Sequence, residues 1–288
     1  MLTQRLFTWT SVPVALIVCL RPMSRRGYSV ALWIHVCLCL IAWGVYAFMR
    51  YTYSFNKADP GGDATTQRCV EYDHRGCRVI EYTPPSRPRR RILAFPGLMI
   101  SVRRMLREPC IVPFLDDSIV VCYQTRGFGD SDLFVDLSTQ TMAEDSLSQH
   151  LNFEMRTESL PTFFVGYSLG SFLALQLLSN ERFGGDCRLA VLVNGFFDCT
   201  HIYHTFRLMT SLMGISNADL VGLSRVPILA VHSRSDVTVQ PSESARLVRA
   251  CRRLTPPRPV DRLLVEGDHA HYHFGDAEGL RYRRALDV

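Results

Sequence analysis

Residues 161–171 read PTFFVGYSLGS, in which a short apolar run leads into the motif Gly-x-Ser-x-Gly at residues 166–170. The apolar run predicts a buried β-strand, and the amphipathic residues that follow the motif predict a helix. A turn this sharp holds the serine in a strained backbone conformation, and a side chain at either glycine would collide with the neighbouring strand or helix. We therefore expect the hydroxyl of Ser168 to lie at the head of the helix, where the helix dipole favours negative charge.

From about residue 90 onward, the chain alternates between short apolar runs and helical stretches. Such alternation predicts a mostly parallel sheet, and the continuous apolar character of each run indicates a sheet covered on both faces. The predicted strands are residues 92–95, 118–123, 162–165, 189–193, 227–231 and 262–265. The predicted helices include residues 142–155, 171–179 and 241–254.

Two runs of alternating polarity precede this pattern, at residues 68–72 and 77–82. Residues 73–76, with the sequence DHRG, lie between the runs and form a turn signal, so we expect a β-hairpin. Cys69 and Cys77 could face each other across this hairpin.

The Gly-x-Ser-x-Gly motif between a strand and a helix resembles the nucleophile elbow of the serine α/β-hydrolases. The resemblance runs from about residue 68 to the C-terminus. It implies an α/β-hydrolase fold, with a mostly parallel central sheet, helices on both faces and a short cap. It also implies a catalytic serine at Ser168, followed along the chain first by an acid and then by a histidine. The histidine is needed because a serine hydroxyl is a poor nucleophile until a neighbouring base removes its proton.

Residues 228–241, with the sequence ILAVHSRSDVTVQP, look like the acid turn of this superfamily. In that turn an apolar strand is followed by a loop that carries Asp, then Val and Pro. The resemblance therefore assigns Asp236 as the acid of the triad. Asp198 follows the preceding predicted strand and is a weaker candidate, because some α/β-hydrolases place the acid there.

Three histidines follow the last predicted strand, in the sequence LLVEGDHAHYH at residues 263–273. His269 stands where the superfamily has its catalytic histidine, so the resemblance assigns it as the base. A metal site formed with His271 and His273 is the rival interpretation. We disfavour it because no cysteine or carboxylate pair elsewhere in the chain has matching ligand spacing. The expected chemistry therefore requires no metal and no cofactor.

The oxyanion of the expected reaction needs two backbone N–H groups that point to the place where negative charge develops. The resemblance assigns one to Leu169, directly after the nucleophile. The other should come from the loop after residues 92–95, whose sequence is PGLM. The superfamily usually has His-Gly at the start of this loop, and here Pro96 replaces the histidine. The glycine is retained, and we expect Leu98, with Met99 as the alternative, to donate the second N–H.

The first 50 residues contain five arginines and no acidic residue, which accounts for the whole formal net charge of +5. Residues 29–49 are uncharged and long enough to cross a bilayer as a helix. A shorter apolar run at residues 6–20 contains Pro13 and could be a second span, a re-entrant piece or a signal-peptide core. The following Arg21-Pro22 argues against cleavage. We expect residues 1–53 to be a membrane anchor and residues 54–67 to be a linker.

The hydrolase domain is expected at residues 68–288, with a possible cap at residues 196–225. The cap region is rich in Phe, Met and Leu, and it could either wall an acyl pocket or form ordinary core helices. After residue 50 the chain has 27 basic and 27 acidic side chains, so its charge gives no reason to expect nucleic acid as a partner. Seven cysteines lie outside the apolar segments, so in an oxidising compartment at least one is free or paired between chains.

The motifs together predict a serine hydrolase that cleaves an ester or thioester bond through an acyl-enzyme. A membrane anchor raises the local concentration of lipid substrates, which favours a lipid or acylated substrate. The alternatives are a serine peptidase of the same fold and a catalytically inactive, membrane-bound binding protein. Three arginines precede residues 29–49 closely, whereas only Arg50 and Lys57 follow closely. This asymmetry places the hydrolase domain in a lumen or outside the cell, with the cytosol as the other possibility.

Overall fold

The computed structural model describes residues 68–74, 77–97, 100–124, 160–179, 187–198 and 215–287. The apolar segments at residues 6–20 and 29–49, the linker at 54–67 and the predicted helix at 142–155 lie outside these ranges. Within the described ranges, no helix is both long enough and apolar enough to cross a membrane. The membrane anchor therefore stays a prediction.

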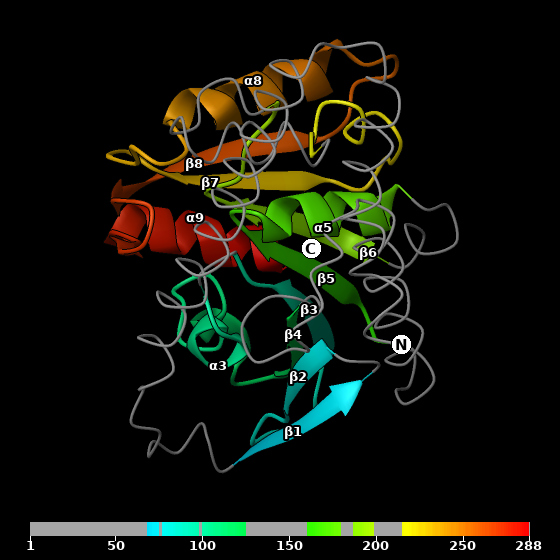
Figure 1. Ribbon diagram of the computed structural model, residues 1–288, viewed down its shortest axis with the longest axis vertical. Helices are drawn as coiled ribbons and strands as arrows, with labels where there is room; N and C mark the ends of the chain where they lie inside the picture. Colours follow the sequence, from blue (N-terminus) through cyan, green and yellow to red (C-terminus); the bar gives the residue numbers. More distant parts are fainter. Residues whose placement is uncertain are drawn as a thin grey trace, which may run out of the picture. The chain divides into compact units, whose positions relative to one another are not determined.

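The described chain forms a nine-stranded sheet in the order β1-β2-β4-β3-β5-β6-β7-β8-β9 (Figure 1). The strands are β1 (Cys69–His74), β2 (Cys77–Tyr82), β3 (Arg90–Phe95), β4 (Ser118–Gln124), β5 (Thr162–Tyr167), β6 (Cys187–Val193), β7 (Ile228–Ser233), β8 (Val260–Gly267) and β9 (Tyr272–His273). The six strands from β4 to β8 in this order run parallel to one another. The outer strands β1, β2 and β9 pair in antiparallel fashion.

The predicted mostly parallel sheet is confirmed, and each of its six predicted strands overlaps an observed one; only residues 227–231 begin one residue early, because β7 starts at Ile228. The hairpin of β1 and β2 is also confirmed. The expectation that Cys69 and Cys77 could face each other is wrong, because the register pairs Cys69 with Tyr82 and Cys77 with His74. Each cysteine thus lies at one end of the ladder.

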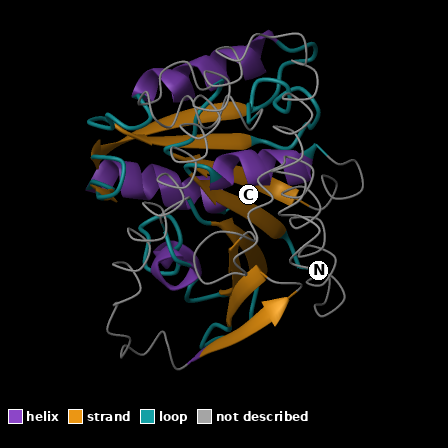
Figure 2. Cartoon of the chain, viewed as in Figure 1, coloured by secondary structure: helices purple, strands orange, loops and turns teal. Residues whose placement is uncertain are grey.

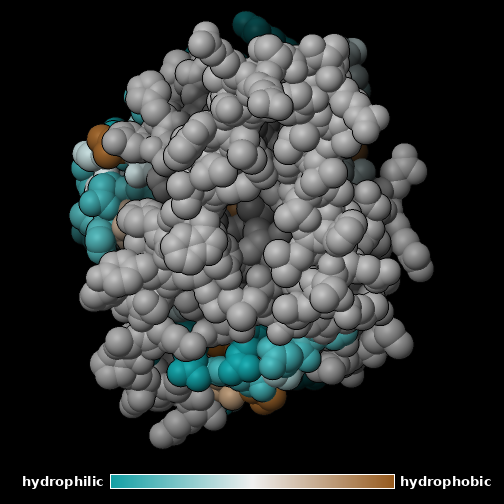
Figure 3. Space-filling view, viewed as in Figure 1, coloured by the Kyte–Doolittle hydropathy of each residue, from teal (hydrophilic) through white to brown (hydrophobic). Residues whose placement is uncertain are grey.

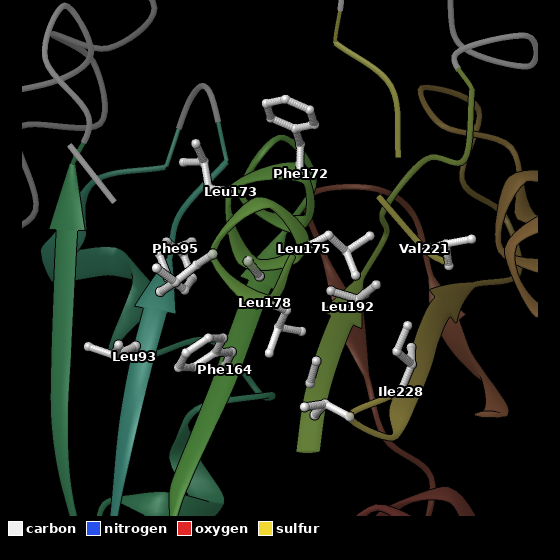
Figure 4. Close-up of a cluster of buried hydrophobic side chains, with 14 of the residues drawn as sticks. Leu93, Phe95, Phe164, Phe172, Leu173, Leu175, Leu178, Leu192, Val221 and Ile228 are labelled. Carbon is white, nitrogen blue, oxygen red and sulfur yellow. The ribbon is translucent and has the colours of Figure 1, made fainter. Parts of the chain in front are cut away.

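Helices cover both faces of the sheet (Figure 2). Helices α5 (Gly170–Leu178) and α8 (Pro241–Arg253) pack on one face, in a hydrophobic cluster with alternate strand residues such as Leu93, Phe164 and Leu192. Figure 4 shows this cluster, with side chains of β3, β5, β6 and β7 around α5. Alternation of side chains along each strand supplies a separate apolar set to each face, as the continuous apolar runs predicted.

The opposite face carries α3 (Val102–Met105), the short 3₁₀ helix at Val112–Phe114, and α9 (Asp276–Leu286). The strand residues between those of the first cluster point to this face, among them Ile92, Val165 and Val231. Tyr282 of α9 is buried there and its hydroxyl donates a hydrogen bond of 2.6 Å to the Cys110 carbonyl. The described surface over β1 is mostly hydrophilic, as Figure 3 shows along its lower edge.

The predicted cap is described only at its two ends, residues 196–198 and 215–225. These ends lie side by side, because the Asn217 N–H donates a 2.8 Å hydrogen bond to the Phe197 carbonyl. Phe196 belongs to the hydrophobic core on the α5 face. The remaining cap residues, which include most of the predicted apolar wall, lie outside the described chain.

Candidate active site

The strand-to-helix turn at Ser168 has the strained geometry that its sequence predicted. Ser168 follows β5 directly and has a φ of +51°, in the left-handed region that non-glycine residues rarely adopt. Its N–H donates a 2.8 Å hydrogen bond to the Val193 carbonyl of β6. A Cβ at Gly166 would lie 2.4 Å from the Gly170 carbonyl oxygen, and a Cβ at Gly170 would lie 1.9 Å from the Phe95 carbonyl oxygen. Both glycines are therefore required for β5, α5 and β3 to approach this closely.

The structure brings Ser168, His269 and Asp236 together from three separate parts of the chain. His269 lies in the turn after β8, and Asp236 lies in the turn after β7. The Nε2 atom of His269 lies 3.1 Å from Ser168 Oγ, and its Nδ1 atom lies 2.7 Å from Asp236 Oδ2. Because β5, β7 and β8 are parallel, their carboxyl ends meet at one edge of the sheet, which is why these distant residues come into contact.

Asp236 is 3% exposed and its carboxylate is surrounded by hydrogen-bond donors. Its Oδ1 atom accepts hydrogen bonds of 2.9 Å from the N–H groups of Thr238 and Val239. Its Oδ2 atom faces His269 and also lies 3.5 Å from Nε2 of the buried His232. Burial acts to raise the pKa of Asp236, but hydrogen bonds from His232 and His269 outweigh it and hold the pKa below its ordinary value. The carboxylate is therefore ionised at neutral pH.

The second candidate acid, Asp198, is held in a different place. Its carboxylate forms an ion pair with Arg246 of α8, and its N–H donates a 3.1 Å hydrogen bond to the buried carboxylate of Glu243. Arg246 also lies 3.2 Å from Glu243. The acid that contacts the ring of His269 is thus Asp236 and not Asp198.

The two further histidines point away from this centre. His271 has a side chain that is 79% exposed and lies 3.5 Å from Asp268. His273 is exposed on β9, opposite Glu266 of β8. In the part of the chain that the structure describes, no group of three His, Cys, Asp or Glu side chains is placed to hold a metal ion.

The structure describes one of the two predicted oxyanion donors, Leu169, and does not describe the other, Leu98. Leu169 directly precedes α5, whose first residue is Gly170, so its N–H lies at the amino end of that helix. Leu98 and its alternative Met99 lie outside the described residues. The start of their loop is described, and a Cβ at Gly97 would lie 3.0 Å from the Tyr167 ring and 3.1 Å from Ser168 Cβ. The loop therefore begins beside the nucleophile, and Leu98 stays a prediction.

Three polar residues at the site were not predicted from the sequence. Tyr167 ends β5, Asn194 follows β6, and His232 lies within β7. All three are buried, and each lies near the carboxyl end of a strand next to the predicted triad. The sequence signal for these residues is a polar side chain at or near the end of an otherwise apolar run.

No family model matches the sequence, and no curated protein matches it either. Solved structures do resemble it. A carboxyl esterase from Bacillus coagulans matches with a TM-score of 0.59 and 13% identity, over 76% of this chain and 95% of that chain. The thioesterase domain from the curacin biosynthetic pathway matches with a TM-score of 0.53 and 14% identity, over 76% of this chain and 98% of that domain.

An acylaminoacyl peptidase from Pyrococcus horikoshii also matches, with a TM-score of 0.57 and 12% identity. The match covers 76% of this chain and 40% of the peptidase, so this chain spans less than half the length of that enzyme. At such low identities the likeness establishes the fold and not the activity. The described residues between 68 and 287 have the fold of the α/β-hydrolases, the superfamily that the sequence motifs resemble.

Proposed function

We propose that this chain is a serine hydrolase that cleaves an ester or thioester bond of a lipid or acylated substrate. The observation that carries the proposal is the continuous contact from Ser168 Oγ through the His269 ring to the Asp236 carboxylate. Each residue has the chemical character its role needs: a hydroxyl nucleophile on a strained turn, an imidazole base, and a buried ionised acid.

In the first step, Ser168 Oγ attacks the carbonyl carbon of the substrate while Nε2 of His269 takes the hydroxyl proton. Asp236 accepts the hydrogen bond from Nδ1, which fixes the ring tautomer and stabilises the imidazolium that forms. The negative charge moves to the carbonyl oxygen. The tetrahedral intermediate then collapses, the alcohol or thiol leaves with the proton from His269, and the acyl group stays on Ser168.

In the second step, water attacks the acyl-enzyme and His269 takes one proton from it. Collapse of the second tetrahedral intermediate releases a carboxylic acid and returns the proton to Ser168. In both steps the oxyanion is stabilised by the N–H of Leu169 and by a second N–H, assigned by sequence resemblance to Leu98. All groups that this mechanism uses belong to the chain itself.

The substrate class rests on the predicted membrane anchor at residues 1–53. An anchor confines the domain to the neighbourhood of a bilayer, where lipid esters and acylated proteins are concentrated. Apolar residues in the predicted cap would suit an acyl chain. These two features support a lipid or acylated substrate over a soluble metabolite.

A fluorophosphonate probe, which reacts covalently with an activated serine, tests the proposal directly. We expect the full-length protein to be labelled and to hydrolyse a short-chain ester, and Ser168→Ala to lose both activities. Loss of the nucleophile of a triad costs about six decades in rate. Ser179→Ala is the matched control, because Ser179 follows the last residue of the same helix and its hydroxyl donates to the Gln176 carbonyl.

Two outcomes would contradict the proposal. An unlabelled wild-type protein that is folded would indicate an inactive binding protein. Equal labelling of wild type and Ser168→Ala would show that another residue reacts. A substrate panel of esters, thioesters and peptide amides then separates a carboxylic ester hydrolase from a peptidase.

A further inference from the structure

Asn194 has an unusual backbone conformation for a residue that plays no part in the proposed chemistry. It directly follows β6, its side chain is fully buried, and its φ is +47°. Among the described non-glycine residues, only Ser168 shares a positive φ. Strained backbone of this kind is concentrated at functional sites, where surrounding contacts hold it in place. The hydrogen bonds of Asn194 indicate which parts of the site this backbone conformation holds together.

The side-chain amide of Asn194 bridges the two loops that carry the acid and the histidine. Its Oδ1 atom accepts a 2.8 Å hydrogen bond from the Ser233 N–H, at the end of β7 and three residues before Asp236. Its Nδ2 atom donates a 3.1 Å hydrogen bond to the carbonyl oxygen of His269. The main-chain N–H of Asn194 also donates to the Val231 carbonyl at 2.9 Å, which fixes the bridge to β7.

The carbonyl oxygen of His269 has a second donor. The hydroxyl of Tyr167, the residue before the nucleophile, donates to the same oxygen. Tyr167 is buried and its ring stacks on Tyr272, with ring centroids 5.9 Å apart. Burial raises the pKa of the Tyr167 hydroxyl well above its ordinary value, so the hydroxyl remains a donor at neutral pH.

These bonds hold the main chain of His269, whereas Asp236 and Ser168 contact its ring. We propose that Asn194 is a positioning residue that fixes the distance between the histidine and acid loops, with Tyr167 as the second donor to the histidine carbonyl. Neither residue touches the reacting atoms. The inference deepens the proposed hydrolase function and rests on it.

Asparagine suits both requirements of this position. Its amide supplies one acceptor and one donor, which match the N–H of Ser233 and the carbonyl of His269. Asparagine also tolerates the left-handed backbone region better than most residues.

Asn194→Asp keeps the size and the acceptor but replaces the donor with an oxygen that faces the His269 carbonyl. Asn194→Gly accepts the positive φ and removes both arms of the bridge.

The first test is steady-state hydrolysis of a short-chain ester by the full-length protein in detergent. We expect Asn194→Asp and Asn194→Gly to lower kcat by about 10- to 100-fold with KM within about two-fold of wild type, because a misplaced catalytic group slows the chemical step. Tyr167→Phe should lower kcat by a smaller factor. Tyr282→Phe is the matched control, because it removes a buried hydroxyl that donates to the main-chain carbonyl of Cys110 and not to that of His269.

The second test observes the histidine without catalysis. In its hydrogen bond to Asp236, the Nδ1 proton of His269 should give a downfield proton resonance. We expect this resonance to broaden or shift upfield in Asn194→Gly and to be unchanged in Tyr282→Phe. This readout also covers the case in which the wild-type protein proves inactive, so failure of the positioning role and failure of the proposed function are distinguishable.

Wild-type kcat in folded Asn194→Gly would overturn the inference, as would an unchanged resonance in that variant. If Asn194→Gly fails to fold, the kcat of Tyr167→Phe tests the inference instead. This variant removes one donor to the His269 carbonyl and keeps the ring. An equal loss of kcat in Tyr282→Phe and Tyr167→Phe would also overturn the inference. Such a result would mean that any lost buried hydroxyl lowers kcat by destabilising the core.

Discussion

At the scale of single residues, Asp236 and Asp198 show how environment separates two similar carboxylates. Both follow neighbouring parallel strands near the same edge of the sheet. Asp236 is buried and accepts hydrogen bonds from two backbone N–H groups and the His269 ring. Asp198 is partly exposed and pairs with a guanidinium, so its charge serves the contact between α8 and the start of the cap region. Only the first arrangement can stabilise an imidazolium during proton transfer.

We therefore expect Asp236→Asn to lower kcat for ester hydrolysis by roughly 10⁴, because an amide at this place favours the wrong tautomer of the histidine. Asp198→Asn should change kcat by less than about ten-fold, although it weakens the pair with Arg246. Steady-state kinetics on the two purified variants measure the difference. A larger loss in Asp198→Asn would move the acid to that position.

The sequence predicted the three residues that the structure brings together, and it did not predict their supports. Ser168, Asp236 and His269 each lie in a local motif whose order along the chain is itself informative. Asn194 and Tyr167 have no such motif. Their role depends on a carbonyl oxygen at residue 269, and contacts across 75 and 102 residues become visible only when the parallel strands are placed side by side.

At the scale of elements, the glycines of the elbow decide how closely α5 approaches the sheet. Gly170 begins α5, and its Cα lies so near β3 that an added Cβ would be 1.9 Å from the Phe95 carbonyl oxygen. This contact is with backbone, so no side-chain movement can relieve it. The strand-to-helix turn and the position of Ser168 therefore depend on the same close approach.

Gly170→Ala should destabilise the folded protein by roughly 3 kcal/mol or more, since the clash forces β3 and α5 apart. Gly279→Ala is the matched control, because Gly279 lies within α9 and an added Cβ would meet only Phe274 Cβ, at 3.7 Å. Gly279→Ala should raise the free energy of unfolding by about 0.5–1 kcal/mol. Denaturant unfolding of both variants provides the comparison, and equal stabilities would contradict this account of the elbow.

The elements that the sequence did not predict are those with weak periodic signals. Helix α3 has only four residues and β9 only two. Helix α9 is longer, but five of its 11 residues are charged, and only Tyr282 and Leu286 are buried. Its packing against the sheet depends on Tyr282, which reaches the Cys110 carbonyl from the far end of the chain. Such a contact has no local signature.

At the scale of the whole molecule, the start of the domain and its site lie at opposite ends of the parallel strands. β1 begins at Cys69, which pairs with Tyr82, and Tyr82 in turn pairs with Val120 near the start of β4. The chain therefore enters the sheet at the amino ends of the parallel strands. Ser168, Asp236 and His269 all lie at the carboxyl ends. The described chain therefore begins at the edge of the sheet opposite the site.

The predicted membrane anchor would place the site on one side of a bilayer, and that side would decide which substrates the site can meet. Arg21, Arg25 and Arg26 directly precede residues 29–49, whereas Arg50 and Lys57 follow. Positively charged loops are retained in the cytoplasm, so the excess before residues 29–49 predicts a hydrolase domain in a lumen or outside the cell. This holds whether or not residues 6–20 also span, because that segment changes only the location of Met1.

Protease protection in sealed microsomes, with an epitope tag after Val288, tests this topology. We expect the tag to survive digestion until detergent opens the vesicles, which would favour lumenal or extracellular lipid esters as substrates. A cytosolic tag on an established membrane protein provides the control for sealed vesicles. Digestion of the Val288 tag without detergent would place Ser168 in the cytosol, where S-acylated proteins become the better substrate class.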